Sequence, residues 1–212
     1  MNLSFSTRGW PGLTWEEMVD TALQMGFTGI EVYNLPKFPD MLAKGGPFHL
    51  YQTAATARDL REKKLTIPCF DTSCDISAED CCADDLRILM EVARNTGVAY
   101  VVCCALSDNE DLVCARLEKL LPVAEEMGVT LLIKTSGIYA DTARLRAMLD
   151  SFASDCLAAL WDVHHPYRDY GETGDTTIKN LGAYVRHVHL RDSDDTGAYQ
   201  LDLVSGALDR VG

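Results

Sequence analysis

The chain has 212 residues, of which 47% are hydrophobic and 24% charged, and its formal net charge is -13. These values are typical of one globular domain spanning residues 1–212. The acidic balance argues against a nucleic-acid partner, because affinity for phosphates depends largely on Lys and Arg. No apolar run approaches the roughly eighteen residues of a membrane span, so we expect no membrane partner either.

The cysteines and the N-terminus favour a cytoplasmic protein. The eight cysteines contain no C-x-x-C pair, and several lie inside apolar strand patterns, where a thiol behaves as a small hydrophobe. Residues 1–5 lack the basic region and apolar core that open a secretory signal. Free, reduced thiols in the cytoplasm are therefore expected.

Short apolar runs alternate along the chain with longer amphipathic stretches. A capping box, Thr14 with Glu17, opens the first helix, and Gly26 ends it. The predicted strands are 3–6, 29–33, 65–70, 99–105, 129–135, 157–163 and 184–190. The later predicted helices are 51–63, 78–95, 109–127, 141–152 and 176–181.

This alternation predicts a parallel sheet wrapped by helices. A strand about every thirty residues, with no Gly-rich phosphate loop, favours a (β/α)8 TIM barrel over a doubly wound sheet. After the seventh strand only 199–204 resembles another, so we expect a chain that is truncated or a barrel that closes abnormally. Two unpaired edges would favour closure by a partner, as in a homo-oligomer.

Two segments near the C-terminus carry the most chemical information. Residues 161–168 read WDVHHPYR and residues 187–192 read HVHLRD, and each follows a predicted buried strand. Parallel strands of a barrel end at one face, so Asp162 and His189 are expected to converge there. Carboxylate and imidazole together are a ligand set for a divalent metal such as Zn, Mn or Co. The alternative is an Asp and histidines that only cap the two strands.

These motifs, in their order, resemble the xylose-isomerase-like TIM-barrel superfamily. That superfamily contains sugar-phosphate isomerases and epimerases and the endonuclease IV group, of the AP endonuclease family 2 type. The matching pieces are Gly29-Ile30-Glu31-Val32, residues 128–133, residues 161–165, and His187-Val188-His189 with Asp192. The resemblance covers essentially the whole chain, but it does not name a substrate.

The resemblance implies a divalent metal (Mn, Zn, Co or Mg) bound by Glu, Asp, His and Glu at the ends of strands five to eight. By position, Asp162 and His189 match the second and third ligands, and His165 matches a histidine that contacts substrate or metal-bound water. The first ligand position holds Lys134, and no residue of this sequence matches the fourth. Both missing carboxylates also transfer protons in such epimerases, so their absence weakens metal binding and acid/base chemistry alike.

Lys134 leaves three interpretations open. It forms an ion pair with Asp162 and replaces the metal, it binds an anionic substrate oxygen, or it is a desolvated amine that forms a Schiff base. The ion pair predicts a binding or regulatory barrel, the anion-binding lysine predicts a sugar isomerase, and the Schiff base predicts a lyase.

Five further residues are candidates for substrate binding. Glu31 lies near the end of the second predicted strand and would bind a sugar hydroxyl, or pair with Arg8 or Lys134. Arg8 and Trp10 offer a cation and an aromatic wall after the first strand, unless they belong to an ordinary surface loop. Arg168 follows strand six as a substrate-orienting or solvated charge. His187 shares its strand face with His189 and would support it.

The function predicted from the sequence is a metal-dependent isomerase or epimerase of a small sugar or sugar phosphate. Asp162 and His189 would bind the metal, and Lys134 and His165 would be the catalytic residues. The reaction would be proton transfer beside a carbonyl that the metal polarises. The alternatives are a catalytically inactive sugar-binding barrel with Lys134 paired to Asp162, and a Schiff-base lyase that uses Lys134.

Overall fold

The computed structural model describes residues 2–10, 12–81, 83–193 and 199–200. Seven parallel strands form one curved sheet in which each strand pairs with its neighbours in chain order. The strands are β1 (Ser4–Ser6), β2 (Gly29–Tyr33), β3 (Phe70–Asp75), β4 (Tyr100–Cys104), β5 (Thr130–Lys134), β6 (Leu157–Asp162) and β7 (Val185–His189). The predicted TIM-barrel class is confirmed as an incomplete barrel, since β7 and β1 are not paired within the described residues.

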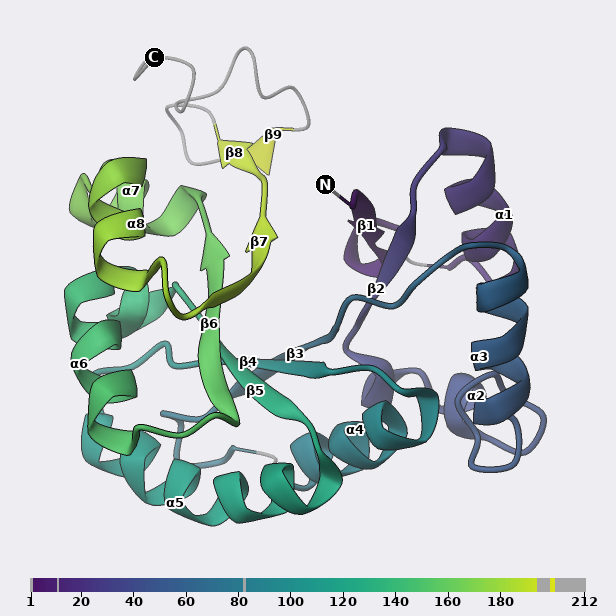
Figure 1. Ribbon diagram of the computed structural model, residues 1–212, viewed down its shortest axis with the longest axis horizontal. Helices are drawn as coiled ribbons and strands as arrows, with labels where there is room; N and C mark the ends of the chain where they lie inside the picture. Colours follow the sequence, from purple (N-terminus) through teal and green to yellow (C-terminus); the bar gives the residue numbers. More distant parts are fainter. Residues whose placement is uncertain (1, 11, 82, 194–198, 201–212) are drawn as a thin grey trace.

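Helices cover the outer side of the sheet (Figure 1). They are α1 (Trp15–Met25), α2 (Pro39–Leu42), α3 (Thr53–Glu62), α4 (Ala83–Thr96), α5 (Glu110–Met127), α6 (Thr142–Phe152), α7 (His164–Tyr170) and α8 (Gly174–Leu181). Short 3-10 turns are η1 (Thr7–Gly9), η2 (Leu35–Lys37) and η3 (Gly137–Ala140). None of the helices in the described part of the chain has the length and apolar character needed to cross a bilayer.

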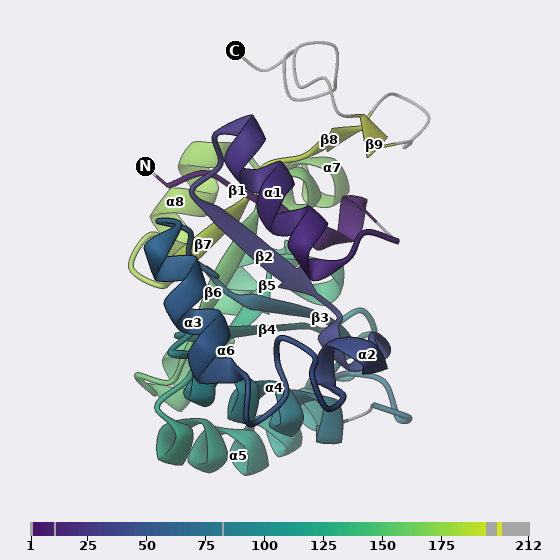
Figure 2. The same ribbon diagram turned by 90° about the vertical axis from the view of Figure 1, so that its right-hand side faces the viewer.

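The first helix forms as the sequence predicts. Thr14 accepts a hydrogen bond from the Glu17 amide while Glu17 reaches back to the Thr14 amide, which satisfies donors that a helix start leaves unpaired. Gly26 ends the helix in the left-handed conformation, with φ of 74°. The helix α1, bounded in this way, lies beside the strand β2, as Figure 2 shows.

Three predicted elements differ from the structure. The third strand is β3 at Phe70–Asp75 rather than 65–70, and of the earlier segment Thr66 forms only an isolated bridge with Gly29. Pro68 lies in that segment and cannot donate to a strand ladder. The helix predicted from 78 begins at Ala83, because Asp75 and Ser77 hydrogen-bond within the preceding turn. The segment after strand six, for which no helix is predicted before residue 176, contains α7.

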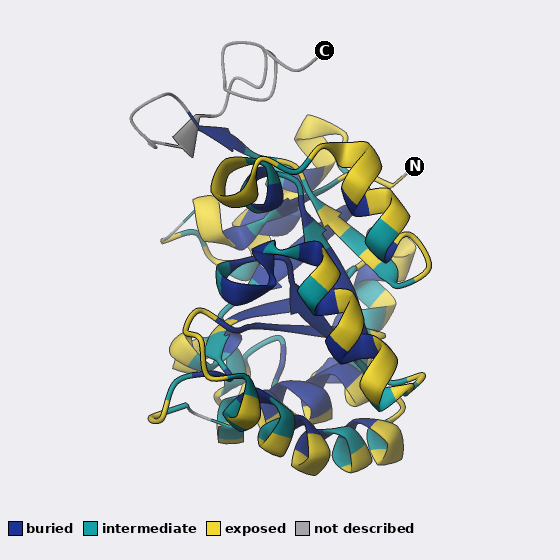
Figure 3. Cartoon of the chain, turned by 90° about the vertical axis from the view of Figure 1, so that its left-hand side faces the viewer, coloured by how far each residue is buried: buried dark blue, intermediate teal, exposed yellow. Residues whose placement is uncertain are grey.

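Strands β2, β4, β5 and β6 are mostly buried, while the outer faces of the helices are exposed (Figure 3). The largest core cluster lies between sheet and helices and includes Phe70, Leu86, Val101, Leu117 and Leu131. A smaller cluster consists of Cys69, Val102, Leu132, Ala158 and Leu160. Because side chains alternate along a strand, these residues occupy the opposite, inner face of the sheet.

The chain after β7 contains β8 (Asp192–Ser193), which pairs antiparallel with β9 (Tyr199–Gln200). The segment 199–204, considered above as a further strand, is described only at its first two residues, which are β9. Residues 201–204 lie outside the described residues. Within the described chain, β1 and β7 are the two edges of the curved sheet.

Candidate functional site

The inner face of the sheet becomes polar at the carboxyl ends of its strands. Asp71, Lys134 and Asp162 each follow by two residues an apolar member of the inner cluster, so they face the same interior. This polar layer consists of Glu31 on β2, Asp71 on β3, Lys134 on β5, Asp162 on β6, and His187 and His189 on β7. TIM-barrel enzymes build their active sites at this end of the barrel.

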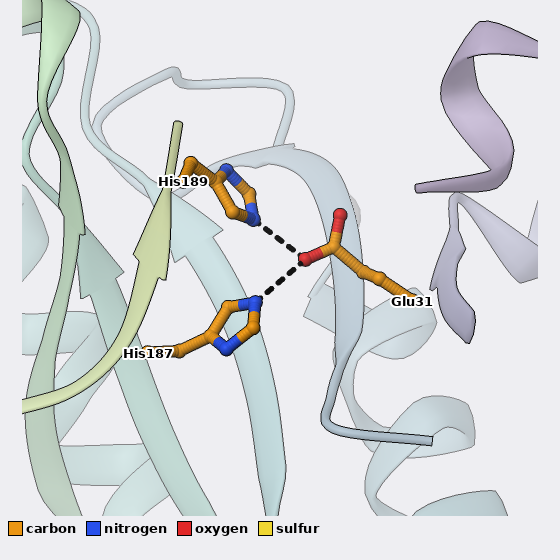
Figure 4. A group of neighbouring side chains, drawn as sticks. All are labelled: Glu31, His187 and His189. Carbon is orange, nitrogen blue, oxygen red and sulfur yellow. Dashed lines mark hydrogen bonds and ion pairs between the residues drawn. The ribbon is translucent and has the colours of Figure 1, made fainter. Parts of the chain in front are cut away.

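Glu31 joins β2 to β7 across the interior. Its Oε2 accepts hydrogen bonds from His187 Nε2 at 3.1 Å and His189 Nε2 at 2.5 Å, as Figure 4 shows. Burial alone would raise the pKa of Glu31, but the two imidazole hydrogen bonds outweigh it and hold the pKa well below its ordinary value. The pairings of Glu31 with Arg8 or Lys134 considered from the sequence do not form.

Lys134 is ion-paired with Asp71, not with Asp162. The distance from Lys134 Nζ to Asp71 Oδ2 is 2.7 Å, and both side chains are almost fully buried. Burial acts to lower the pKa of Lys134, but the charge and hydrogen bond of Asp71 outweigh it and raise the pKa above its ordinary value. The predicted Lys134–Asp162 pair is therefore wrong, and Lys134 is an ammonium group held between β3 and β5.

Asp162 and His189 are direct neighbours on β6 and β7, as predicted. They nevertheless have different partners. Asp162 is fully buried and forms an ion pair with Arg191, at 2.5 Å between Oδ2 and Nη2. A guanidinium therefore stands beside the carboxylate that the sequence assigns to a metal.

His165 lies on α7 between Arg191 and Asp169. Arg191 Nη2 donates to His165 Nε2 at 2.6 Å, and the distance from His165 Nδ1 to Asp169 Oδ2 is 3.1 Å. Because a guanidinium only donates, Nε2 must accept and the proton belongs on Nδ1, facing the carboxylate. Asp169 thus orients the His165 ring, with Nε2 as its accepting side.

The other predicted substrate-binding residues contact residues outside this polar layer. The Arg8 guanidinium lies 5.0 Å from the centre of the Tyr33 ring, and Trp10 stacks on Phe5 at 4.9 Å. Arg168 is exposed on α7 and donates to Ser193 Oγ at 2.8 Å. These contacts place Arg8 and Trp10 beside β1 and β2, and Arg168 beside β8.

From the sequence, Asp71 is expected to be a polar residue at the catalytic face or a cap of the following helix, and no role is predicted for Arg191. Asp71 follows the inner-facing Cys69 by two residues, and this alternation indicates that it faces the interior. Arg191 follows His189 by two residues, so strand alternation was the available signal.

Solvent reaches the histidines of this site more readily than its carboxylates. The side chains of His187, His189 and His165 are 17%, 18% and 20% exposed, whereas those of Glu31 and Asp162 are 3% and 0% exposed. A separate cavity of about 580 Å³ lies between α3 and the end of α4, lined by Leu60, Arg61 and Val98 among others. That cavity contains none of the residues of the polar layer.

Two groups of side chains have the chemistry of metal ligands, and in each group the candidate ligand atoms lie within 4.8 Å of one another. One is Glu31, His187 and His189, and the other is Asp162, His164 and His165. Carboxylate and imidazole suit a borderline divalent cation. Glu31 fits such an ion further, since its Oε1 is buried and makes no hydrogen bond of good geometry with the described residues.

The sequence matches the model of the xylose isomerase-like TIM barrel family over residues 19–206. Similar solved structures include the probable 3-DHS dehydratase AsbF of Bacillus anthracis, with 16% identity and a TM-score of 0.75, covering 92% of this chain and 75% of that one. The zinc-bound IOLI protein has 16% identity and a TM-score of 0.73, covering 92% and 74%.

The 3-keto-D-glucoside 4-epimerase YcjR of E. coli, in its apo form, is 14% identical with a TM-score of 0.73, covering 95% of this chain and 84% of that one. At such identities the likeness shows the fold alone. A comparison of the sequence with curated proteins finds no significant match.

Proposed function

The chain belongs to the xylose isomerase-like TIM-barrel family, and from this premise we propose that it is a metal-dependent isomerase or epimerase of a small sugar or sugar phosphate. The reaction is proton transfer beside a carbonyl group. One observation carries the proposal, namely that a fixed ammonium, an oriented imidazole and two imidazole–carboxylate groups lie at the carboxyl ends of the strands. The epimerase among the similar structures supports this reaction class.

Lys134 supplies positive charge to the substrate. Its ammonium is held by Asp71 at 2.7 Å, so it is already oriented when a negatively charged oxygen develops beside it. The raised pKa of Lys134 keeps the amine protonated, and a protonated amine cannot attack a carbonyl. We therefore favour an electrostatic role over the Schiff-base lyase.

His165 moves the proton. Its Nε2 carries the lone pair, and Asp169 on the opposite side of the ring would stabilise the imidazolium formed when Nε2 takes a proton from carbon. Arg191 occupies Nε2 in this structure and would have to release it to substrate. A guanidinium displaced in this way could then bind a phosphate or carboxylate of the substrate.

A divalent cation would polarise the substrate carbonyl and so make the neighbouring proton more acidic. His189 is retained as a ligand in this proposal. Asp162 is available only when Arg191 leaves it, because the two groups form an ion pair. Arg8, Trp10 and Arg168 remain proposed substrate contacts at the edges of the site.

We also propose that the protein works in the cytoplasm. Six of the described cysteines, Cys69, Cys81, Cys103, Cys104, Cys114 and Cys156, are free thiols. Burial raises the pKa of Cys104 to about 12, which favours the unreactive thiol form. Such thiols suit a reducing compartment.

Solvent exchange of the substrate proton tests the function directly. The protein would be incubated in D2O with Mn2+ or Zn2+ and a set of ketoses, aldoses and their phosphates, and NMR would follow deuterium incorporation beside the carbonyl. We expect exchange and isomer formation for at least one sugar, and loss of both in the Lys134→Met variant. No exchange with any sugar by folded, metal-loaded protein would contradict the proposal.

A binding barrel without catalysis is the second candidate. It is favoured by the two internal ion pairs, Lys134–Asp71 and Asp162–Arg191, which neutralise charges that an enzyme would direct at substrate. Sugar binding by calorimetry without deuterium exchange would select this alternative.

A further inference from the structure

We infer that Glu31, His187 and His189 form the binding site for one borderline divalent cation such as Zn2+. The site would link β2 to β7 and would not use Asp162. This inference deepens the proposed function, on which it rests for the role of the metal, by identifying the residues that hold the ion. It differs from the ligand set predicted from the sequence in two of its three members.

The ligand atoms are already close to a coordination geometry. Tetrahedral zinc with bonds of about 2.0–2.1 Å places its ligand atoms roughly 3.3 Å apart. Glu31 Oε2 lies 3.1 Å from His187 Nε2 and 2.5 Å from His189 Nε2. The second separation has to lengthen by less than about 1 Å for an ion to replace the Nε2 protons that now point at the carboxylate, and the ligand atoms already lie within 4.8 Å of one another.

Backbone geometry aims both imidazoles at the same point. His187 and His189 are two residues apart on β7 and therefore share one face of the strand. Their rings are nearly perpendicular, with centroids 5.3 Å apart, and both extend toward Glu31 (Figure 4). Two Nε2 ligands and one carboxylate are the protein ligands of many catalytic zinc sites, which leave a fourth position open.

The burial of Glu31 gives the cation a reason to bind. The residue is 2% exposed, and its ion-pair partners within the described chain are the two imidazoles. Its Oε1 is buried without a well-aligned hydrogen bond, which is costly for a charged oxygen. Since solvent reaches the histidines and hardly the carboxylate, a small ion fits this position better than a sugar hydroxyl does.

The second group, Asp162 with His164 and His165, also has a buried carboxylate oxygen without a well-aligned hydrogen bond, Asp162 Oδ2, but it differs in the charge beside it. Arg191 lies 2.5 Å from Asp162 and 2.6 Å from His165, so a cation is already present. A dication brought to the same atoms would be repelled by that guanidinium.

Metal titration of the folded wild-type protein tests the site without any substrate. The protein, freed of metal by a chelator, would be titrated with Zn2+ by calorimetry and with Co2+ by visible absorption. We expect one ion per chain, and a cobalt spectrum typical of four or five ligands. Saturation at a hundredfold excess over Kd should raise Tm by about 5–10 °C.

Matched variants locate the ligands. Glu31→Gln and His187→Gln should each weaken Zn2+ binding by roughly a hundredfold or more, since even residues that only support a metal ligand contribute 10–100-fold. Asp162→Asn and the distant His49→Gln should change the affinity by less than about threefold. Circular dichroism would verify folding, and if Glu31→Gln fails to fold, His187→Gln alone decides the question.

Each outcome bears on the inference. Absence of Zn2+ and Co2+ binding by the wild type, or loss of binding in Asp162→Asn but not in His187→Gln, would overturn it. Binding as described, together with no deuterium exchange on any sugar, would leave this site standing and remove the proposed function. Deuterium exchange that requires a metal but is insensitive to Glu31→Gln would support the proposed function and overturn this metal site.

Discussion

The two imidazole–carboxylate groups of this barrel contain similar side chains but differ in what surrounds them. Around Glu31 the ion-pair partners are two histidines, the Cys69 thiol also donates to Oε2 at 3.3 Å, and Oε1 is left without a good hydrogen bond. Around Asp162 a guanidinium touches both the carboxylate and His165. Ligand types alone therefore do not locate a cation site, because a neighbouring fixed positive charge decides which group is open to an ion.

The largest effect that can separate the two groups is expected at His165. In His165→Gln, kcat for deuterium exchange should fall by about 10²–10⁴, because the ring that accepts the proton is gone. Zinc affinity measured by calorimetry should stay unchanged, since His165 belongs to the Asp162 group, where Arg191 takes the place of a metal ion. Parallel loss of zinc binding and turnover would show that both groups form one site and would refute the distinction between them.

Loss of the buried ammonium should have the next largest effect. Lys134→Met leaves the Asp71 carboxylate buried and unpaired, so the free energy of unfolding should fall by about 3–5 kcal/mol in urea denaturation. The double variant Lys134→Met/Asp71→Asn should recover part of this loss, because no buried charge remains. An unchanged unfolding midpoint in the single variant would contradict the pairing.

Removal of the guanidinium sharpens the comparison further. Arg191→Met takes the positive charge away from Asp162 and His165, so a second Zn2+ should bind with an affinity at least about tenfold above that of the wild type at this position. Calorimetric stoichiometry checks this, with Arg186→Met as a control at an exposed arginine. If the variant still binds one Zn2+ per chain, the Arg191 guanidinium does not explain why the two groups differ.

The smallest effect concerns pH. Burial lowers the pKa of His164 below its ordinary value, so the folded protein takes up this proton less readily than the unfolded chain. Stability from this group is complete above about pH 6.5 and is lost as the pH falls below that value, by at most about 1–2 kcal/mol. Urea unfolding at pH 7 and pH 5 should show a smaller decrease in His164→Asn, and an equal decrease would refute the assignment.

Much of the fold could be predicted from periodicity and end signals. The strand β2 and the end of α5 at Gly128 occur where the apolar pattern and the glycine place them. The third strand was misplaced because the apolar segment before Phe70 looks like a strand but contains Pro68. The helix α7 was missed because Pro166 and its two preceding histidines are not typical helix formers.

The site was less predictable than the fold. Adjacency of Asp162 and His189 follows from neighbouring strands, and it is confirmed by their register. The partners of Lys134 and Glu31 come from strands 63 and about 156 residues away in the chain. Such pairings depend on side-chain reach across the barrel interior, which strand order alone does not specify.

The edge strand β7 has one neighbouring strand, β6, within the described chain. On its other side, β7 contacts β2 through the Glu31 carboxylate. An ion held by Glu31, His187 and His189 would therefore fasten the two open ends of the sheet to each other.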